Sequence, residues 1–150
     1  NITRIIQYKE TTTTSHITKT SGQQITEFNC DITPSNAASH ILLIANVMVG
    51  ADNNADLALV FTEGGSNISD SQGASGGSVN SSFITGMNVS STQGAQYTGF
   101  HNHHPNTTSS ITYGLKAFPN GSRTMYINRR GADATYTARS RLIVLEIGDL

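Results

Sequence analysis

Three of the five histidines lie within four consecutive residues, His101-Asn102-His103-His104. If this segment is extended, His101 and His103 point to the same side, because side chains alternate across a strand. One such pair supplies two imidazole nitrogens, too few for a tetrahedral or octahedral metal site. In a homotrimer, three copies of the pair around a threefold axis would supply enough nitrogens to hold iron or another first-row transition metal. The alternative is a polar loop tip before Pro105 whose histidines are solvated or contact a neighbour.

Two further short segments carry groups suited to contact with a ligand or a partner subunit. His104 and Asn106 flank Pro105 in the same polar stretch. Arg129 and Arg130 lie together in the charged segment 128–133, and guanidinium groups bind carboxylates or sulfated sugars through paired hydrogen bonds. A solvated hairpin end explains these arginines equally well.

No pattern of residues indicates catalysis. The serines do not lie on the strand-to-helix turn that a Gly-x-Ser-x-Gly nucleophile needs. The glycine-rich segment 73–78 has no following lysine to complete a phosphate-binding loop. The adjacent letters His101-Asn102-His103 do not reproduce the dispersed motif and metal-binding helix of an HNH nuclease. The sequence therefore predicts no catalytic residue, and no cofactor beyond a metal on a trimer axis.

Composition and charge exclude further classes. Nine basic and ten acidic residues give a formal net charge of −1, so there is no electrostatic field to gather nucleic acid. The longest apolar run, 41–49, is about half the roughly 20 residues that span a bilayer, which predicts no membrane insertion. The single cysteine, Cys30, alternates with Phe28 and Ile32 and is expected to be a buried thiol.

The elements that must position these groups are strands, because short runs alternate between apolar and polar residues and end at turn residues. The run 40–49 is apolar on both sides, which predicts a central strand covered on both faces, and 142–147 is similar. Asn120-Gly121 favours a tight hairpin that joins 111–118 to 124–128. The segments 64–80 and 129–140 are expected to be loops. The remaining expected strands are 3–9, 12–20, 24–32, 57–61, 83–89 and 96–100.

About nine to eleven strands at this spacing predict an all-β fold, an antiparallel, jelly-roll-like β-sandwich. Residues 1–150 are expected to be one domain, and a start without methionine fits a trimmed piece of a longer protein. The core of two facing sheets is expected to consume nearly all the hydrophobic side chains. Only loops would then remain to contact partners.

Five segments, in order along nearly the whole chain, resemble a family of phage-encoded fibre and tail-associated domains common in marine phages. The matching segments are 3–7, 32–44, 105–113, 126–129 and 143–147. The chain departs from that family at the histidine-rich residues 101–104 and at the Gly/Ser segment 64–80.

The resemblance implies a non-enzymatic homotrimeric β-sandwich at the tip or stem of a virion fibre, with a role in host adsorption. Its partners would be copies of itself, other virion proteins and a glycan or protein of the host surface, and its location virion or extracellular. A secreted carbohydrate-binding, lectin-like domain is the alternative, although tryptophan, which often stacks on sugars, is absent. A polysaccharide depolymerase is a third candidate, but it needs a placed pair of acids that the sequence does not identify.

Overall fold

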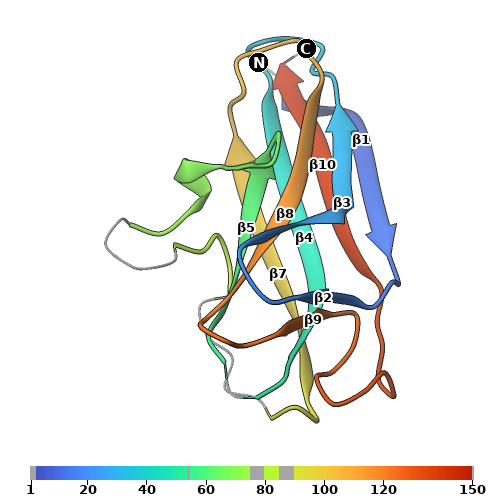
Figure 1. Cartoon of the computed structure of the whole chain (residues 1–150). Coiled ribbons are helices and arrows are strands. Elements are labelled where there is room, and N and C mark those ends of the chain that lie inside the picture. The colour runs from blue at the N-terminus through green and yellow to red at the C-terminus, as the bar shows by residue number, and fades with distance from the viewer. Residues whose placement is uncertain (1–2, 54, 75–79, 85–89, 150) are drawn as a thin grey trace.

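The computed structural model describes residues 3–53, 55–74, 80–84 and 90–149. This part of the chain forms ten strands and one short 3-10 helix (Figure 1). In chain order they are β1 (Thr3–Thr13), β2 (Ile17–Lys19), β3 (Gln23–Ile32), β4 (His40–Ala51), β5 (Leu57–Glu63), β6 (Ser66–Asn67), η1 (Ser69–Ser71), β7 (Gly94–His103), β8 (Ile111–Pro119), β9 (Met125–Ile127) and β10 (Ser140–Asp149).

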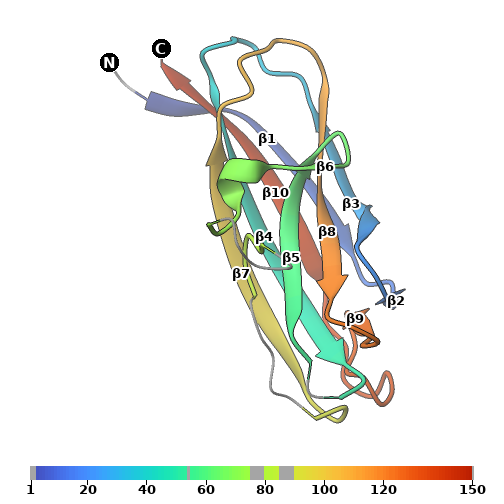
Figure 2. The same ribbon diagram turned by 60° about the vertical axis from the view of Figure 1, so that its left-hand side comes forward.

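The strands form two sheets that face each other, as the side view in Figure 2 shows. The first sheet has the order β1-β10-β4-β9-β2, and β7 pairs with β4 along its other side. The second sheet has the order β3-β8-β5-β6. The pairs of named strands are antiparallel. The predicted antiparallel, jelly-roll-like β-sandwich is therefore confirmed, and the ten described strands fall within the predicted number.

The core lies between the sheets, where alternate side chains of each strand point inward. In β4 these are Ile41, Leu43, Ala45, Val47 and Val49, which are all completely buried. The second sheet contributes bulkier side chains from β3, β5 and β8, among them Phe28, Phe61, Tyr113 and Leu115. Such β-branched and aromatic residues suit a pleated surface that is buried on one side.

The predicted pairing after the Asn120-Gly121 turn was wrong. The turn itself forms, with Gly121 at φ +57° and the amide of Arg123 bonded to the carbonyl of Asn120 at 3.1 Å. However, β9 then pairs with β2 and β4 in the first sheet and not with β8. The chain crosses between the sheets because Met125 and Ile127 bury their side chains completely in the core there.

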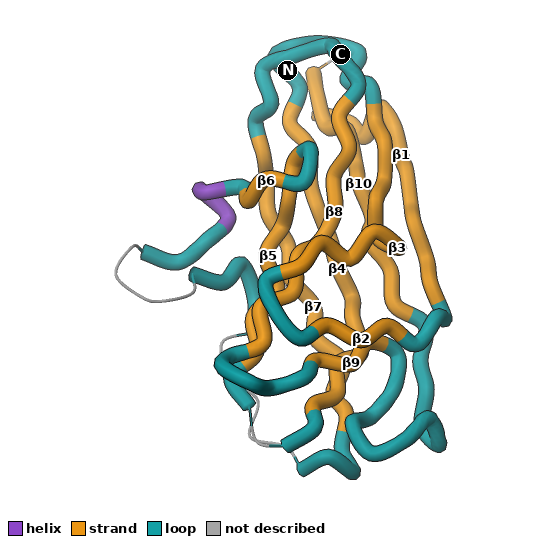
Figure 3. The backbone as a smooth tube through the Cα atoms, viewed as in Figure 1, coloured by secondary structure: helices purple, strands orange, loops and turns teal. Residues whose placement is uncertain are grey.

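Three other expected elements differ from the structure. The expected strand 12–20 is divided, since residues 12 and 13 end β1 and β2 contains Ile17–Lys19 alone. From the expected strand 83–89, Phe83 makes one isolated bridge with Leu59, and 85–89 lie outside the described residues. The expected loop 64–80 contains β6 and η1, visible as the purple turn in Figure 3, while 75–79 are not described.

The expectation that β4 is covered on both faces was also wrong. Its even-numbered side chains Leu42 and Ile44 lie on the outer face of the first sheet and are half-buried. On the same face, Phe100 of β7 is 78% exposed. The core therefore does not consume nearly all the hydrophobic side chains, and a sheet face as well as loops is left to contact partners.

Two smaller expectations concern Cys30 and the membrane. Cys30 is buried in β3, opposite Tyr113, as predicted. Among the described residues, no helix has the length and apolar character needed to cross a bilayer.

Candidate metal centre

β7 carries both histidines of the His-x-His pair. His101 lies opposite Leu43 and His103 opposite Ile41, so both belong to the sheet and the loop-tip interpretation was wrong for these two residues. Cross-strand partners share a face, and Leu43 and Ile41 face the core. Both imidazoles are therefore directed inward, toward the space between the sheets. Their side chains are 14% and 13% exposed.

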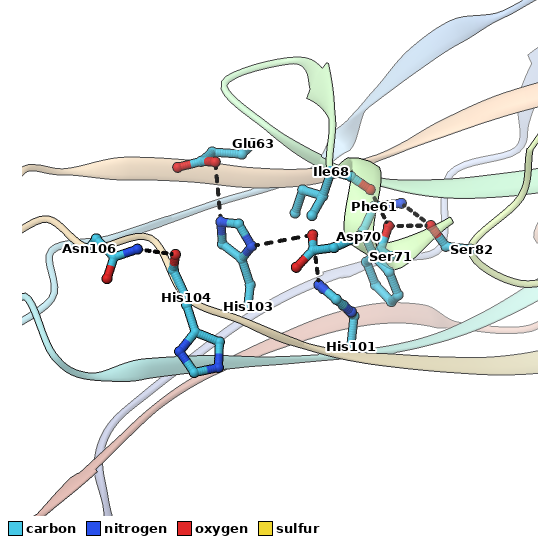
Figure 4. Close-up of polar contacts among 10 residues, drawn as sticks. All are labelled: Phe61, Glu63, Ile68, Asp70, Ser71, Ser82, His101, His103, His104 and Asn106. Atoms are coloured by element: carbon cyan, nitrogen blue, oxygen red, sulfur yellow. Dashed lines mark hydrogen bonds and ion pairs between the residues drawn. The ribbon is translucent and has the colours of Figure 1, made fainter. Parts of the chain in front are cut away.

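The helix η1 brings Asp70 to the same place. It begins after Ile68, whose side chain is buried and whose amide bonds to the carbonyl of Phe61 at 2.9 Å. The hydroxyl of Ser71 donates to the carbonyl of Ile68 at 2.7 Å and lies 2.6 Å from the hydroxyl of Ser82. These contacts attach the helix to the edge of the second sheet and hold Asp70 over β7 (Figure 4).

One carboxylate oxygen faces both imidazoles. Asp70 Oδ1 lies 3.4 Å from His101 Nε2 and 3.9 Å from His103 Nδ1. The three side chains can place one donor atom each within 4.8 Å of one another. Figure 4 shows both rings turned toward Asp70. The sequence pattern supplies two candidate ligands, and the fold brings a third candidate, Asp70, from the same chain.

Glu63, the last residue of β5, holds the other side of His103. His103 Nε2 lies 3.2 Å from Glu63 Oε2, and the carboxylate can only accept a hydrogen bond, so Nε2 carries the proton. In the neutral ring the lone pair is then on Nδ1, the nitrogen that faces Asp70. A carboxylate that orients a metal-binding histidine through its second nitrogen is a common feature of metal sites.

Two ring nitrogens of this cluster are buried and lack a hydrogen-bond partner among the described residues. They are His101 Nε2 and His103 Nδ1, the two atoms that face Asp70. Their distances to Asp70 describe ion pairs, but the contacts do not meet the geometry of a hydrogen bond. Buried polar atoms are nearly always bonded, and here the two nitrogens without a hydrogen bond of good geometry face the same carboxylate oxygen.

Burial also favours the neutral form of one ligand. Desolvation lowers the pKa of His101, and this effect exceeds the opposing attraction of Asp70. A neutral imidazole is the form that binds a metal ion. The phenol of Tyr113, whose ring edge meets His103 with the centroids 5.8 Å apart, likewise has its pKa raised by burial and then by Glu63.

His104 and Asn106 lie near this cluster but are not part of it. The ring of His104 contacts that of His40 at a tilted angle with centroids 3.8 Å apart, and Figure 4 shows it pointing away from Asp70. Asn106 has a φ of +52° and donates to the carbonyl of His104 at 3.1 Å. Both shape the turn after β7, and their predicted contacts with a ligand or partner stay predictions.

Arg129 and Arg130 are remote from the histidines, close to the start of β7. Arg129 donates to the carbonyls of Arg130 and Gly131 and covers the ring of Tyr126 at 4.4 Å. Arg130 forms a two-bond pair with Asp133 at 2.7 and 2.8 Å. Both guanidinium groups therefore have structural partners within the chain, and their predicted role in contact with a ligand or partner stays a prediction.

No protein-family model matches the sequence, and no curated protein does. Solved structures with a similar arrangement include the infectious bursal disease virus VP2 subviral particle, at 10% identity and a TM-score of 0.42. A second is the structure of infectious bursal disease virus Gx strain, at 12% identity and a TM-score of 0.41. Each match covers 95% of this chain and 40% of the other, so the chain spans well under half the length of these proteins.

Sequence reasoning found the two histidines but missed Glu63 and Asp70. Glu63 ends an apolar strand, which is an ordinary place for a solvated charge. Asp70 is the single acidic residue of 64–80, a stretch of small and polar residues that the sequence predicts to be a loop. A buried apolar residue beside it, Ile68, is the one signal that this stretch folds back on the sandwich.

Proposed function

We propose that the chain is a non-enzymatic module of a virion fibre or tail-associated structure, and that it assembles with copies of itself. Two observations support the proposal. One is the ordered resemblance of five sequence segments to phage fibre domains. The other, which carries the proposal, is an apolar face of the first sheet that the chain itself leaves uncovered.

That face consists of cross-strand rows on β1, β10, β4 and β7. One row is Glu10, Ile143, Ile44 and Phe100, and the next is Tyr8, Leu145, Leu42 and Asn102. Ile5 pairs with Ile147 beyond them. We call the exposed and half-buried apolar members the outer apolar face: Ile5, Tyr8, Leu42, Ile44, Phe100, Ile143 and Ile147; Leu145 in the same rows is 9% exposed.

The exposure of this face exceeds what scattered surface residues explain. Phe100 is 78% exposed, Ile5 61% and Tyr8 55%. Contiguous apolar patches on a protein surface mark contact sites, because each square ångström covered there contributes about 25 cal/mol. The face also explains why β4 and β10 are apolar on both sides although only one side faces the core.

The charged residues beside the outer apolar face indicate which kind of surface can cover it. A third row, next to that of Ile143 and Ile44, contains Arg141 and Asn46. Arg141 forms an ion pair with Glu10 of the first row at 3.2 Å. The hydroxyl of Tyr8 also donates to Glu10 at 2.6 Å. Because Glu10 and Arg141 pair with each other, the face has no net charge, and the surface that covers it should also be apolar and without net charge. A second copy of the same face meets that requirement.

Three copies with this face turned to a common axis would give the homotrimer implied by the sequence resemblance. Attachment to other virion proteins and to a host glycan or protein then falls to the loops at the ends of the sandwich. As part of the same proposal, we expect the chain on a virion or in the extracellular medium, with no turnover of a substrate.

The mass of the purified chain in solution tests the proposal. Light scattering coupled to gel filtration should give an oligomer, expected to be a trimer, at micromolar concentration. Phe100→Ser should weaken association at least about tenfold, because exposed aromatic residues are frequent hot spots of interfaces. Tyr136→Ser is the matched control, since Tyr136 is 65% exposed but lies in the 129–140 segment. A wild-type chain that stays monomeric at tens of micromolar would overturn the proposal.

A further inference from the structure

We propose that Asp70, His101 and His103 of a single chain bind a divalent first-row transition metal, zinc being the ion that the donor set suits best. This site differs from a metal on a threefold axis, because the third ligand comes from the same chain. It also does not depend on the proposed function, since it needs no second copy.

The distances are close to those of a bound ion. Ligand atoms about 2.0–2.1 Å from a tetrahedral zinc ion lie roughly 3.4 Å from one another. His101 Nε2 and Asp70 Oδ1 are 3.4 Å apart. His103 Nδ1 is 3.9 Å from the same oxygen, and the three donor atoms all lie within 4.8 Å of one another, so side-chain shifts of at most about 1.4 Å bring them to coordination distance.

The donor atoms are already prepared for coordination. Glu63 accepts from His103 Nε2 and thereby leaves Nδ1 free to act as a ligand. His101 Nε2 and His103 Nδ1 are buried with no hydrogen-bond partner in the described part of the chain. A metal ion would satisfy both at once, which a single proton on either ring cannot do.

The position of the site suits an ion that enters from solution. The Asp70 side chain is 62% exposed, whereas those of the two histidines are 14% and 13% exposed. Two imidazoles and one carboxylate leave room for a further ligand such as water. Imidazole nitrogens select first-row transition metals over magnesium and calcium, which prefer oxygen ligands.

A bound ion would join elements that the sheets do not connect. Asp70 lies in η1, at the edge of the second sheet, and the histidines lie on β7 of the first sheet. Glu63 is on β5 in the second sheet and extends the connection through His103. We therefore expect the metal to raise the melting temperature of the sandwich and to protect the β6–η1 segment from proteases.

Titration of the chelator-treated full-length chain with zinc, followed by calorimetry, measures the binding directly. The expected stoichiometry is one zinc ion per chain, and cobalt should give the visible absorption bands of a tetrahedral site. His101→Gln and His103→Gln should abolish binding. Asp70→Asn should weaken it at least about tenfold and Glu63→Gln about tenfold, since outer-shell partners contribute factors of roughly 10–100.

His104→Gln and His16→Gln are matched controls, because they remove imidazoles outside the triangle and should leave the affinity unchanged. A stoichiometry of one ion per three chains would overturn this proposal and indicate a metal on a threefold axis instead. Loss of binding in His104→Gln would overturn this site in favour of one at the His40–His104 ring pair. A wild-type chain that binds zinc no more tightly than about 1 mM would overturn the proposal. The wild-type stoichiometry and melting temperature decide it even if a variant fails to fold.

Discussion

The hydroxyl of Ser140 donates a 2.5 Å hydrogen bond to Oδ1 of Asn128, and both residues are completely buried. The same hydroxyl oxygen accepts the amide of Met48 at 2.9 Å. Asn128 Nδ2 donates to the carbonyls of Thr13 and Ser15 at 3.0 and 2.9 Å. The two side chains thus connect the start of β10, the end of β9, β4 and the link between β1 and β2.

Removal of this network should be costly. Asn128→Ala removes the acceptor of the buried Ser140 hydroxyl and the donor to the carbonyls of Thr13 and Ser15, and we expect a loss of about 2–4 kcal/mol in the free energy of unfolding. Asn128 has a φ of +63°, which glycine tolerates better than alanine, so Asn128→Gly should be less harmful by about 0.5–1 kcal/mol. Urea unfolding followed by circular dichroism measures both. A loss below about 0.5 kcal/mol for Asn128→Ala would contradict the network's role.

A second prediction concerns Gly131, which is buried where the 129–140 segment crosses the end of β4. A Cβ atom at Gly131 would lie 1.7 Å from the carbonyl oxygen of Ala51, so the backbone must move to admit it. We expect Gly131→Ala to cost about 2–3 kcal/mol, the range of overpacked sites. Gly73→Ala is the control, because a Cβ there meets nothing within 4 Å. Equal melting temperatures for the two variants would show that the segment can shift without cost.

A third prediction follows from the buried carboxylate of Glu146. Its Oε1 accepts from the amide and the hydroxyl of Ser35, both at 2.7 Å, and its Oε2 accepts from Gln7 at 2.6 Å. Desolvation alone would raise its pKa, but the hydrogen bonds outweigh burial and the pKa lies below its ordinary value of 4.5. The ionised form is therefore the one that the fold stabilises.

We expect Glu146 to stabilise the fold more at neutral pH than at acidic pH. A carboxyl group whose pKa is lowered by folding contributes stability that is present above its ordinary pKa and is lost as the pH falls through the folded value. Glu146→Gln should therefore cost about 1–3 kcal/mol at pH 7, and the difference from wild type should shrink below about pH 4. The exposed Glu27→Gln should show no such trend. A difference between wild type and Glu146→Gln that does not change with pH would contradict this account.

A fourth prediction concerns the thiol of Cys30. Burial is the largest cause that raises the pKa of Cys30, and the side chain is 5% exposed. Because the thiolate is the reactive form, a disulfide reagent should label the native chain very slowly and the unfolded chain at once. Rapid stoichiometric labelling without denaturant would show that the core opens near β3.

The sequence predicts the sandwich well because alternation is a local property. In β3, Phe28, Cys30 and Ile32 alternate with polar residues, and the structure buries those three side chains and leaves the intervening ones exposed. Alternation does not show which face of β4 or β10 lies in the core, because both strands are apolar on both sides. Periodicity shows that both faces avoid water, but it does not show whether the chain itself or a partner provides the cover.

The candidate site was only half predictable for a related reason. The spacing of His101 and His103 places them on one face of any strand, and the structure confirms this placement on β7. Asp70 and Glu63 reach them through tertiary contacts that have no sequence period. A residue about 30 positions away enters the site because Ile68 is buried in the core, and only the folded chain shows that consequence.

The pairing of β1 with β10 sets the order of events when the domain is made. These strands join along ten positions, and β10 separates β1 from β4. On a ribosome β1 would therefore wait, with no neighbour in its sheet among the described strands, until β10 has left the exit tunnel. During that interval the edge of β4 that later pairs with β10 is open to water and to other nascent chains. Slow translation of the last segment would lengthen the exposure, so yield in the cell should depend on chaperones that cover unfinished sheets.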